Sequence, residues 1–298
     1  RSLKGREPKS WVAMRRWGVG ILTMMALAGL AAGSVLDSNR VLHADRYEAL
    51  DLQGPVSDMG LAGLEFQEPE GPSYNGQFTY LRLRFGESGA DLRRMGFGRR
   101  GRGAPWSHDW PDAEINFAKI LDATTYIDTY MRGRSGKVLT LDDPELFHYP
   151  VATIIEVGYW RPSDSEVANL REYLLKGGFL IIDDFRDTWA LENFAVQMLR
   201  VLPEYRIQSV PEDHEIFNSF FRIEEPYNLI PPYGWNTPRY LGIFQDNDPV
   251  AGRVMVMINW NQDLQEYWEF SDRGYYPIDL SNEAYKFGVN YLIYAFTH

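Results

Sequence analysis

The sequence contains no cysteine among its 298 residues. This absence excludes disulfide bonds, metal sites built on thiolates and a cysteine nucleophile. No G-x-S-x-G segment presents a serine nucleophile in its place. Segment 133–137 (GRSGK) is not a phosphate-binding loop, because Met131 replaces its first glycine and Val138 its Ser or Thr. Several widespread catalytic motifs are therefore excluded.

Positive charge is scarce after residue 16. Residues 1–16 hold six of the 30 basic residues and one of the 41 acidic residues, which leaves residues 17–298 with a net charge of −16. Such a surface repels nucleic acid and anionic lipid headgroups. We therefore expect no nucleic-acid partner.

One basic segment, 93–103 (RRMGFGRRGRG), interrupts this acidic chain. Arginines among glycines are typical of RNA-binding segments, but the acidic balance opposes that function. We expect the segment to dock on an acidic protein surface or to be a solvated loop. Its arginines are Arg93, Arg94, Arg99, Arg100 and Arg102.

Residues 17–36 (WGVGILTMMALAGLAAGSVL) form the longest uncharged run. Twenty residues at about 1.5 Å each match the ~30 Å hydrocarbon core of a bilayer. The basic flank, residues 1–16, is expected to stay in the cytoplasm. The sequence thus predicts a single-pass anchor in a bacterial inner membrane, with a cytoplasmic N-terminus and a periplasmic C-terminal domain.

The alternative for this segment is a cleaved signal peptide, with Ala26 and Ala28 forming a small-x-small cleavage site. As an anchor, the helix would contact the lipid bilayer along residues 17–36. Its small residues would also allow other membrane helices to approach closely. Candidate contact residues are Gly18, Ala28 and Gly29.

The rest of the chain divides into an arm and a domain. Residues 37–76 are rich in turn-forming Gly and Pro and predict an extended arm. Apolar patterns after residue 76 alternate between strand and helix, which predicts a mostly parallel sheet covered on both faces, a doubly wound, flavodoxin-like α/β domain at 77–298. Strands are predicted at 77–85, 138–141, 151–157, 179–182, 206–210, 240–244 and 253–260; helices are predicted at 113–124, 163–176, 188–202 and 282–296.

Several segments of this domain resemble a family of usually exported bacterial domains of unknown function. The resemblance rests on 78–85 (FTYLRLRF), the turn at 110–112 with Glu114 and Asn116, 170–184 (LREYLLKGGFLIIDD), 215–221 (EIFNSFF), 242–243, 258–261 (INWN) and 284–298 (AYKFGVNYLIYAFTH). It implies a fold similar to class-I glutamine amidotransferases and trehalose-utilisation-like proteins. Amidotransferase chemistry needs a cysteine paired with a histidine, so the missing cysteine favours a non-catalytic binding or structural role.

The apolar segment joined to such a domain also resembles an accessory subunit of bacterial photosynthetic reaction centre–light-harvesting complexes. That resemblance implies a membrane-anchored periplasmic scaffold subunit without catalysis or cofactor, which is our leading hypothesis. Its partners would be other subunits of an integral membrane complex.

The alternative hypothesis is a periplasmic hydrolase or solute-binding module for a small polar, sugar-like ligand. Asp183 and Asp184 follow a buried strand, Glu156 ends another, and His214 lies in a later loop. Ligands of doubly wound sheets bind beyond the carboxyl ends of strands, where such groups could bind a metal or act as acid and base. However, adjacent strand residues point to opposite faces, and Asp often caps a following helix. Convergence in one open pocket would favour the hydrolase.

A second polar cluster consists of His108, Asp109, Asp112 and Glu114. These residue types could form a metal ligand set. The same letters fit a turn followed by a helix start, where early acids suit the helix dipole. We expect the structural role and predict no metal.

Overall fold

The computed structural model describes residues 71–86, 104–133, 135–234 and 236–298. They belong to one compact unit that extends from Phe66 to His298. The predicted tail 1–16, the membrane segment 17–36 with its candidate contact residues, nearly all of the arm 37–76 and the arginines of 93–103 lie outside the described residues. Among the described helices, none combines the length and the apolar character needed to cross a bilayer.

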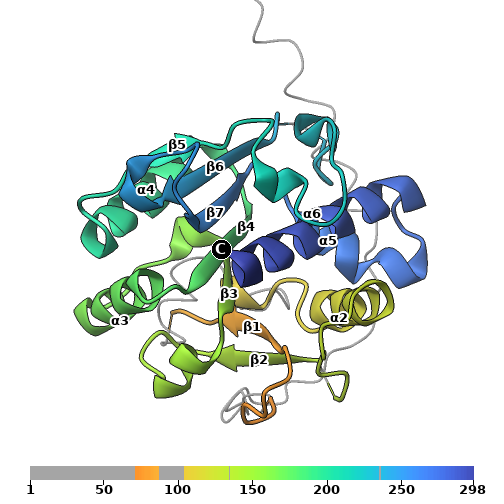
Figure 1. The fold of residues 1–298 in the computed structure, drawn as a ribbon, viewed down its shortest axis with the longest axis horizontal. Coiled ribbons are helices and arrows are strands. Elements are labelled where there is room, and N and C mark those ends of the chain that lie inside the picture. Colours follow the sequence, from red (N-terminus) through yellow and green to blue (C-terminus); the bar gives the residue numbers. More distant parts are fainter. Residues whose placement is uncertain (1–70, 87–103, 134, 235) are drawn as a thin grey trace, which may run out of the picture. The chain divides into compact units, whose positions relative to one another are not determined.

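Seven strands form one sheet in the order β2-β1-β3-β4-β7-β6-β5 (Figure 1). Strands β2, β1, β3, β4 and β7 are parallel, whereas β6 runs antiparallel to both of its neighbours. The prediction of a mostly parallel sheet is confirmed except at β6. The strands are β1 (Tyr80–Leu83), β2 (Gly136–Leu139), β3 (Val151–Ile155), β4 (Phe179–Phe185), β5 (Ile207–Ser209), β6 (Arg239–Phe244) and β7 (Val254–Trp260).

Helices cover both faces of the sheet. In Figure 1, α2 (Asp112–Thr124), α5 (Leu264–Glu269) and α6 (Ile278–Thr297) lie on the right of the sheet, and α3 (Asp164–Leu175) and α4 (Asp187–Val201) lie on the left. Each side has its own hydrophobic core: Phe117 and Trp268 belong to one, Leu170 and Phe194 to the other. Burial on both faces explains why the central strands are apolar at successive positions.

Local signals account for most element boundaries. In the predicted capping box, Ser163 Oγ accepts from Glu166 N at 3.2 Å and the Glu166 carboxylate accepts from Ser163 N at 2.8 Å. Gly177, with φ 106°, then ends α3. The prediction for β2 was wrong by two residues, because Gly136 begins the strand and its missing side chain makes room for the Trp110 ring.

The end of β4 contains a register shift. Ile181 contacts one core and Ile182 the other, yet Phe185 packs in the same core as Ile182. The pairing with β7 shifts between Ile182 and Phe185, and Asp184 has a left-handed φ of 44°. The bulge inserts one residue into the alternation and returns Phe185 to the side of Ile182. Asp183 and Asp184 point apart, as adjacent strand residues do.

The chain reverses its direction of travel across the sheet between β1 and β3, since β2 lies on one side of β1 and β3 lies on the other. Ligands of open α/β sheets bind at the carboxyl ends of strands at such a switch point. The segments that follow β1, β3, β4 and β7 all begin at this edge, so their polar side chains can meet there.

Candidate functional site

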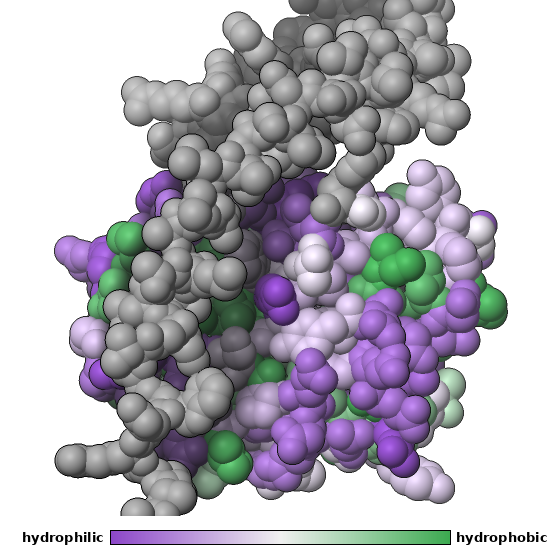
Figure 2. Space-filling view, turned by 90° about the horizontal axis from the view of Figure 1, so that it is seen from above, coloured by the Kyte–Doolittle hydropathy of each residue, from purple (hydrophilic) through white to green (hydrophobic). Residues whose placement is uncertain are grey.

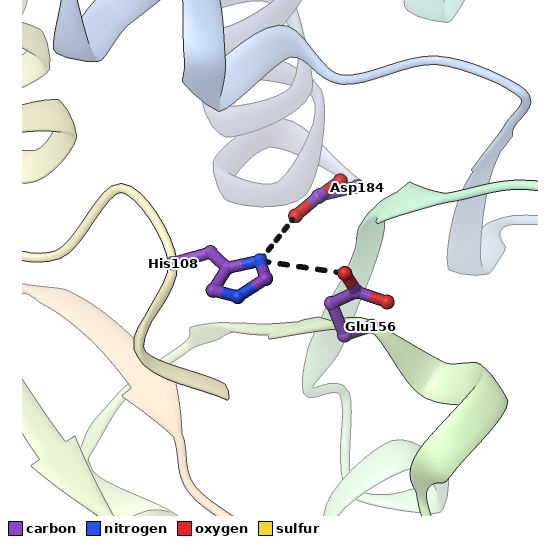
Figure 3. A group of neighbouring side chains, drawn as sticks. All are labelled: His108, Glu156 and Asp184. Atoms are coloured by element: carbon purple, nitrogen blue, oxygen red, sulfur yellow. Dashed lines mark ion pairs between the residues drawn. The ribbon is translucent and has the colours of Figure 1, made fainter. Parts of the chain in front are cut away.

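Three predicted candidates meet at this carboxyl edge (Figure 3). The Nδ1 atom of His108 lies 3.3 Å from Glu156 Oε1 and 3.4 Å from Asp184 Oδ2. His108 precedes α2, Glu156 follows β3, and Asp184 lies near the end of β4. The two candidate sets of the sequence analysis, treated there as separate, therefore share one site.

The backbone at this site adopts a sparsely populated conformation. Asp109, Glu156 and Asp184 have φ values of 62°, 50° and 44°. A left-handed conformation outside glycine costs on the order of 1–3 kcal/mol and persists only where the surrounding structure holds it. The Glu156 N–H donates to the Asp184 carbonyl at 3.1 Å, which links two of these positions. These backbone conformations lower the stability of the fold, and two of them position the carboxylates of Glu156 and Asp184 beside His108.

His108 carries the positive charge of this trio. Hydrogen bonds to Asp184 and then to Glu156 raise the pKa of His108 to about 10, so the ring is an imidazolium at neutral pH. Burial raises the pKa of Glu156, while its hydrogen bond to His108 lowers it. The charged imidazole thus offsets part of the negative charge of the two carboxylates.

More carboxylates surround this trio than the sequence analysis identified. Oxygens of Asp109, Asp184 and Asp263 lie within 4.8 Å of one another, and so do oxygens of Asp109, Glu266 and Glu269. Burial, followed by the charge of Asp184, raises the pKa of Asp109 and Asp263 well above the usual value. We call these five residues the acidic cluster. The Asp263-x-x-Glu266 spacing of a helix N-cap was the available signal for α5, which was not predicted.

A small open cavity borders the acidic cluster and includes Asp184 and Asp263 in its wall. Arg186 and Tyr233 also line it, with the guanidinium carbon 4.0 Å from the ring centroid. The remaining wall is formed by Phe185, Pro231, Pro232, Asn236, Asn261 and Gln262. Amides, an aromatic ring and charged groups around a small cavity suit a small polar ligand.

The prediction that Asp183 belongs to the site was wrong. Its Oδ2 accepts from the backbone N–H groups of Leu264 and Gln265 at 3.0 and 3.1 Å, and its Oδ1 accepts from Asn259 Nδ2 at 3.0 Å. Burial raises the pKa of Asp183 to about 7. The side chain therefore anchors the start of α5, which is the capping role that the sequence analysis had left open.

His214 is also separate from the site. Its Nδ1 accepts from Ile216 N at 3.1 Å, and its ring lies 5.8 Å from the rings of both Phe244 and Tyr294. Phe244 ends the antiparallel strand β6 and pairs with Val254, the first residue of β7. His214 thus lies at the opposite edge of the sheet from Asp184.

The other two members of the second polar cluster have structural partners. Asp112 forms an ion pair with Arg273 on the surface. Glu114 is buried and accepts from Arg82 Nε at 2.9 Å, and Arg82 also contacts Gln265 of α5. The structural expectation holds for Asp112 and Glu114, whereas His108 and Asp109 enter the site.

Comparison with family models finds one match, described as a domain of unknown function (DUF4159), over residues 93–296. The match includes His108, Glu156, Asp184 and the whole acidic cluster. Comparison with curated proteins finds no match.

Proposed function

Since the chain belongs to the DUF4159 family, whose description assigns no activity, we propose a function from the site itself. The domain binds a small polar, sugar-like ligand at the carboxyl edge of the sheet and hydrolyses it. The convergence of His108, Glu156 and Asp184 supports this proposal, and Asp184 also lines the open cavity. The sequence analysis tied the hydrolase to convergence of Glu156, Asp183, Asp184 and His214. Of these four, Glu156 and Asp184 meet, whereas Asp183 holds the start of α5 and His214 lies apart.

Each residue of the trio has a chemical role in this proposal. The His108 imidazolium donates a proton to the leaving-group oxygen, and Glu156, whose pKa burial raises, accepts a proton from the attacking water. Asp184 accepts a hydrogen bond from His108 and holds the ring in place. No covalent intermediate is required, which suits a chain without cysteine.

The cavity wall supports a hydroxylated ligand. Asn236, Asn261 and Gln262 offer amide donors and acceptors, and Tyr233 offers an aromatic surface. Such groups bind sugar hydroxyls through paired donors and acceptors and sugar rings through their apolar faces.

The test uses the full chain in mild detergent with p-nitrophenyl glycosides and esters, and with mono- and disaccharides in thermal-shift assays. His108→Gln and Glu156→Gln are expected to lower turnover by about 10²–10⁴-fold. The control is Asp122→Asn, which removes an exposed carboxylate from α2. Absence of both turnover and thermal shift across the panel would contradict the proposal.

For fold and location, we propose a flavodoxin- or glutamine-amidotransferase-like domain held in the periplasm by residues 17–36. The β2-β1-β3-β4 order with helices on both faces supports the fold, because flavodoxin-like sheets begin with that order. The uncharged run behind a basic flank supports the location. Protease added to spheroplasts should cleave the C-terminal domain; full protection would refute the orientation.

A scaffold role is the second candidate, favoured by an exposed apolar stripe on α4. Trp189, Val196 and Leu199 share one helix face and remain 48%, 57% and 59% exposed. On the face in Figure 2, hydrophobic residues form separate groups among hydrophilic ones. The proposed host is a membrane complex of the photosynthetic reaction centre–light-harvesting type, supported by the sequence resemblance.

A pull-down of the full chain in mild detergent tests this role. Other membrane subunits should co-purify with the wild type and be lost with Val196→Asp/Leu199→Asp. Recovery of a monomeric wild-type chain alone would contradict the scaffold role.

A further inference from the structure

A buried carboxylate oxygen in the acidic cluster lacks a hydrogen-bond partner. Asp263 is only 2% exposed, and while its Oδ1 accepts from Glu266 N at 2.9 Å, its Oδ2 accepts from no described group. The Oδ2 of Asp109 is likewise shielded from solvent, and the Asp109 carboxyl group has those of Glu266 and Glu269 as hydrogen-bonding neighbours. A buried acceptor without a partner costs about 1–3 kcal/mol, and more when charged.

These unpaired oxygens belong to residues that share one space. Oxygens of Asp109, Asp184 and Asp263 lie within 4.8 Å of one another. Oxygens that bind one Mg²⁺ or Ca²⁺ each lie about 2.0–2.6 Å from the ion, so two of them are at most about 5 Å apart. The observed spacing therefore fits a single cation between the three side chains.

The basic side chains that border this space are engaged with other groups. His108 bonds Glu156 and Asp184, Arg82 bonds Glu114 and Gln265, and the Arg186 guanidinium stacks on Tyr233. The charge of Arg186 acts on Asp184 and Asp263 from a distance, but none of these basic groups donates a hydrogen bond to the Oδ2 of Asp263. An external cation would satisfy this oxygen.

We propose that Asp109, Asp184 and Asp263 bind a divalent cation. An all-oxygen ligand set selects a hard ion such as Mg²⁺, Ca²⁺ or Mn²⁺ over zinc or copper. The trio of His108, Glu156 and Asp184 is a poorer choice, because His108 Nδ1 already lies between the two carboxylates at hydrogen-bonding distance. The cavity that Asp184 and Asp263 line leaves room for waters or ligand hydroxyls to complete the coordination.

This inference deepens the proposed function and rests on it for the ligand, because hydroxyl groups of a bound sugar could coordinate the same ion. Cation binding itself needs no substrate. The two proposals can therefore fail separately.

The experiment titrates Mn²⁺, Mg²⁺ and Ca²⁺ into the EDTA-stripped full chain in mild detergent, by calorimetry and thermal unfolding. We expect one saturable site with a Kd at or below about 1 mM and a rise in melting temperature. Asp263→Asn keeps the Oδ1 acceptor that caps α5 but replaces the unpaired Oδ2. It and Asp109→Asn should weaken binding more than about tenfold.

Asp122→Asn is the matched control and should bind as the wild type does. If Asp263→Asn does not fold, Asp109→Asn carries the test. Wild-type-like binding by both folded variants, or no saturable binding by the wild type, overturns the cation site. Turnover that persists in EDTA would show that the cation does not take part in catalysis, and it would leave the hydrolase proposal intact. A bound cation without turnover would overturn only the hydrolase proposal.

Discussion

Two charged assemblies at the same edge of the sheet differ in how their charge is balanced. Arg82 donates to the Glu114 carboxylate and to the carbonyl oxygens of Trp106 and His108, and it also contacts Gln265. Among the described residues, both assemblies contain buried carboxylate oxygens without a hydrogen-bond partner: Glu114 Oε2 in the first, and the Oδ2 atoms of Asp109 and Asp263 in the second. The difference is that Glu114 has a buried guanidinium directly beside it, whereas five carboxylates lie close together in the acidic cluster. Charge that the fold neutralises internally serves stability, whereas charge left unbalanced is available to a ligand.

The same contrast separates two adjacent residues. Asp183 has all of its hydrogen bonds within the protein, and Asp184 faces His108 and the cavity. The alternation of side chains along β4 directs the two aspartates to different neighbours. If the contrast is correct, substitutions of Arg82, Glu114 or Asp183 should mainly lower the stability of the fold. Substitutions in the acidic cluster should mainly affect ligand binding.

The largest effect is expected at the buried ion pair. Arg82→Met leaves the Glu114 carboxylate without its buried counter-charge and should lower the free energy of unfolding by about 3–5 kcal/mol. Urea unfolding of the full chain in detergent measures it. Arg82→Met/Glu114→Met should recover most of the loss, because neither charge then remains; a single variant as stable as the wild type would remove the contrast.

A smaller but selective effect is expected at the adjacent aspartates. Asp183→Ala removes the acceptor for two backbone N–H groups of α5 and for Asn259, and should cost about 2–3 kcal/mol of stability. Asp184→Ala should cost less, since it also relieves repulsion from Asp109 and Asp263. Equal losses in urea unfolding would show that both aspartates are structural.

Removing one charge from the acidic cluster should raise the stability of the fold, whereas the preceding substitutions lower it. Glu269→Gln keeps the side-chain shape and an acceptor for the hydrogen bond with Asp109. It removes a half-buried charge and its repulsion with Glu266, so in EDTA it should raise stability by about 1 kcal/mol. The matched control, Asp122→Asn, should change stability little. Destabilisation by Glu269→Gln in EDTA would mean that the cluster is already balanced.

The sequence predicted the helices and strands where local signals were strong. The capping box at Ser163 and Glu166, the long apolar strands and the periodicity of α6 each identify one element without tertiary information. Helix α5 was missed because six residues show too little periodicity. The N-terminus of α5 is held instead by Asp183, which accepts a hydrogen bond from the N–H of Leu264, 81 residues further along the chain.

The site was predicted only in part, for a physical reason. Strand ends indicated Glu156 and Asp184, because the carboxyl edge of a parallel sheet is known once the strands are known. The pairing of these residues with His108 depends on left-handed backbone positions and on a bulge, which no periodicity reveals. His214 was misplaced because the loop after β5 returns to the opposite end of the sheet, where the ring packs beside Phe244 and Tyr294, and the path of a loop has no periodic signal.

The smallest effect is expected in the pH dependence of stability, at His214 on the opposite edge of the sheet. Burial lowers the pKa of His214, opposed by Glu215 and Asp213 and reinforced by His298. The neutral ring therefore contributes stability above the unfolded-state pKa of about 6.5, and this contribution is lost as the pH falls below it. The buried carboxylates of the site have raised pKa values, so acidification acts on them with the opposite sign.

His214→Asn isolates this contribution, because its Oδ1 can still accept from Ile216 N while the titrating ring is gone. Urea unfolding at pH 7.5 and 5.5 should show the wild type losing stability relative to His214→Asn on acidification. The His298–Glu215 ion pair beside the ring is present in both proteins, so only its interaction with His214 enters the difference. A difference that stays constant between the two pH values would show that His214 titrates alike in the folded and unfolded chains, and that the two edges of the sheet do not differ in this respect.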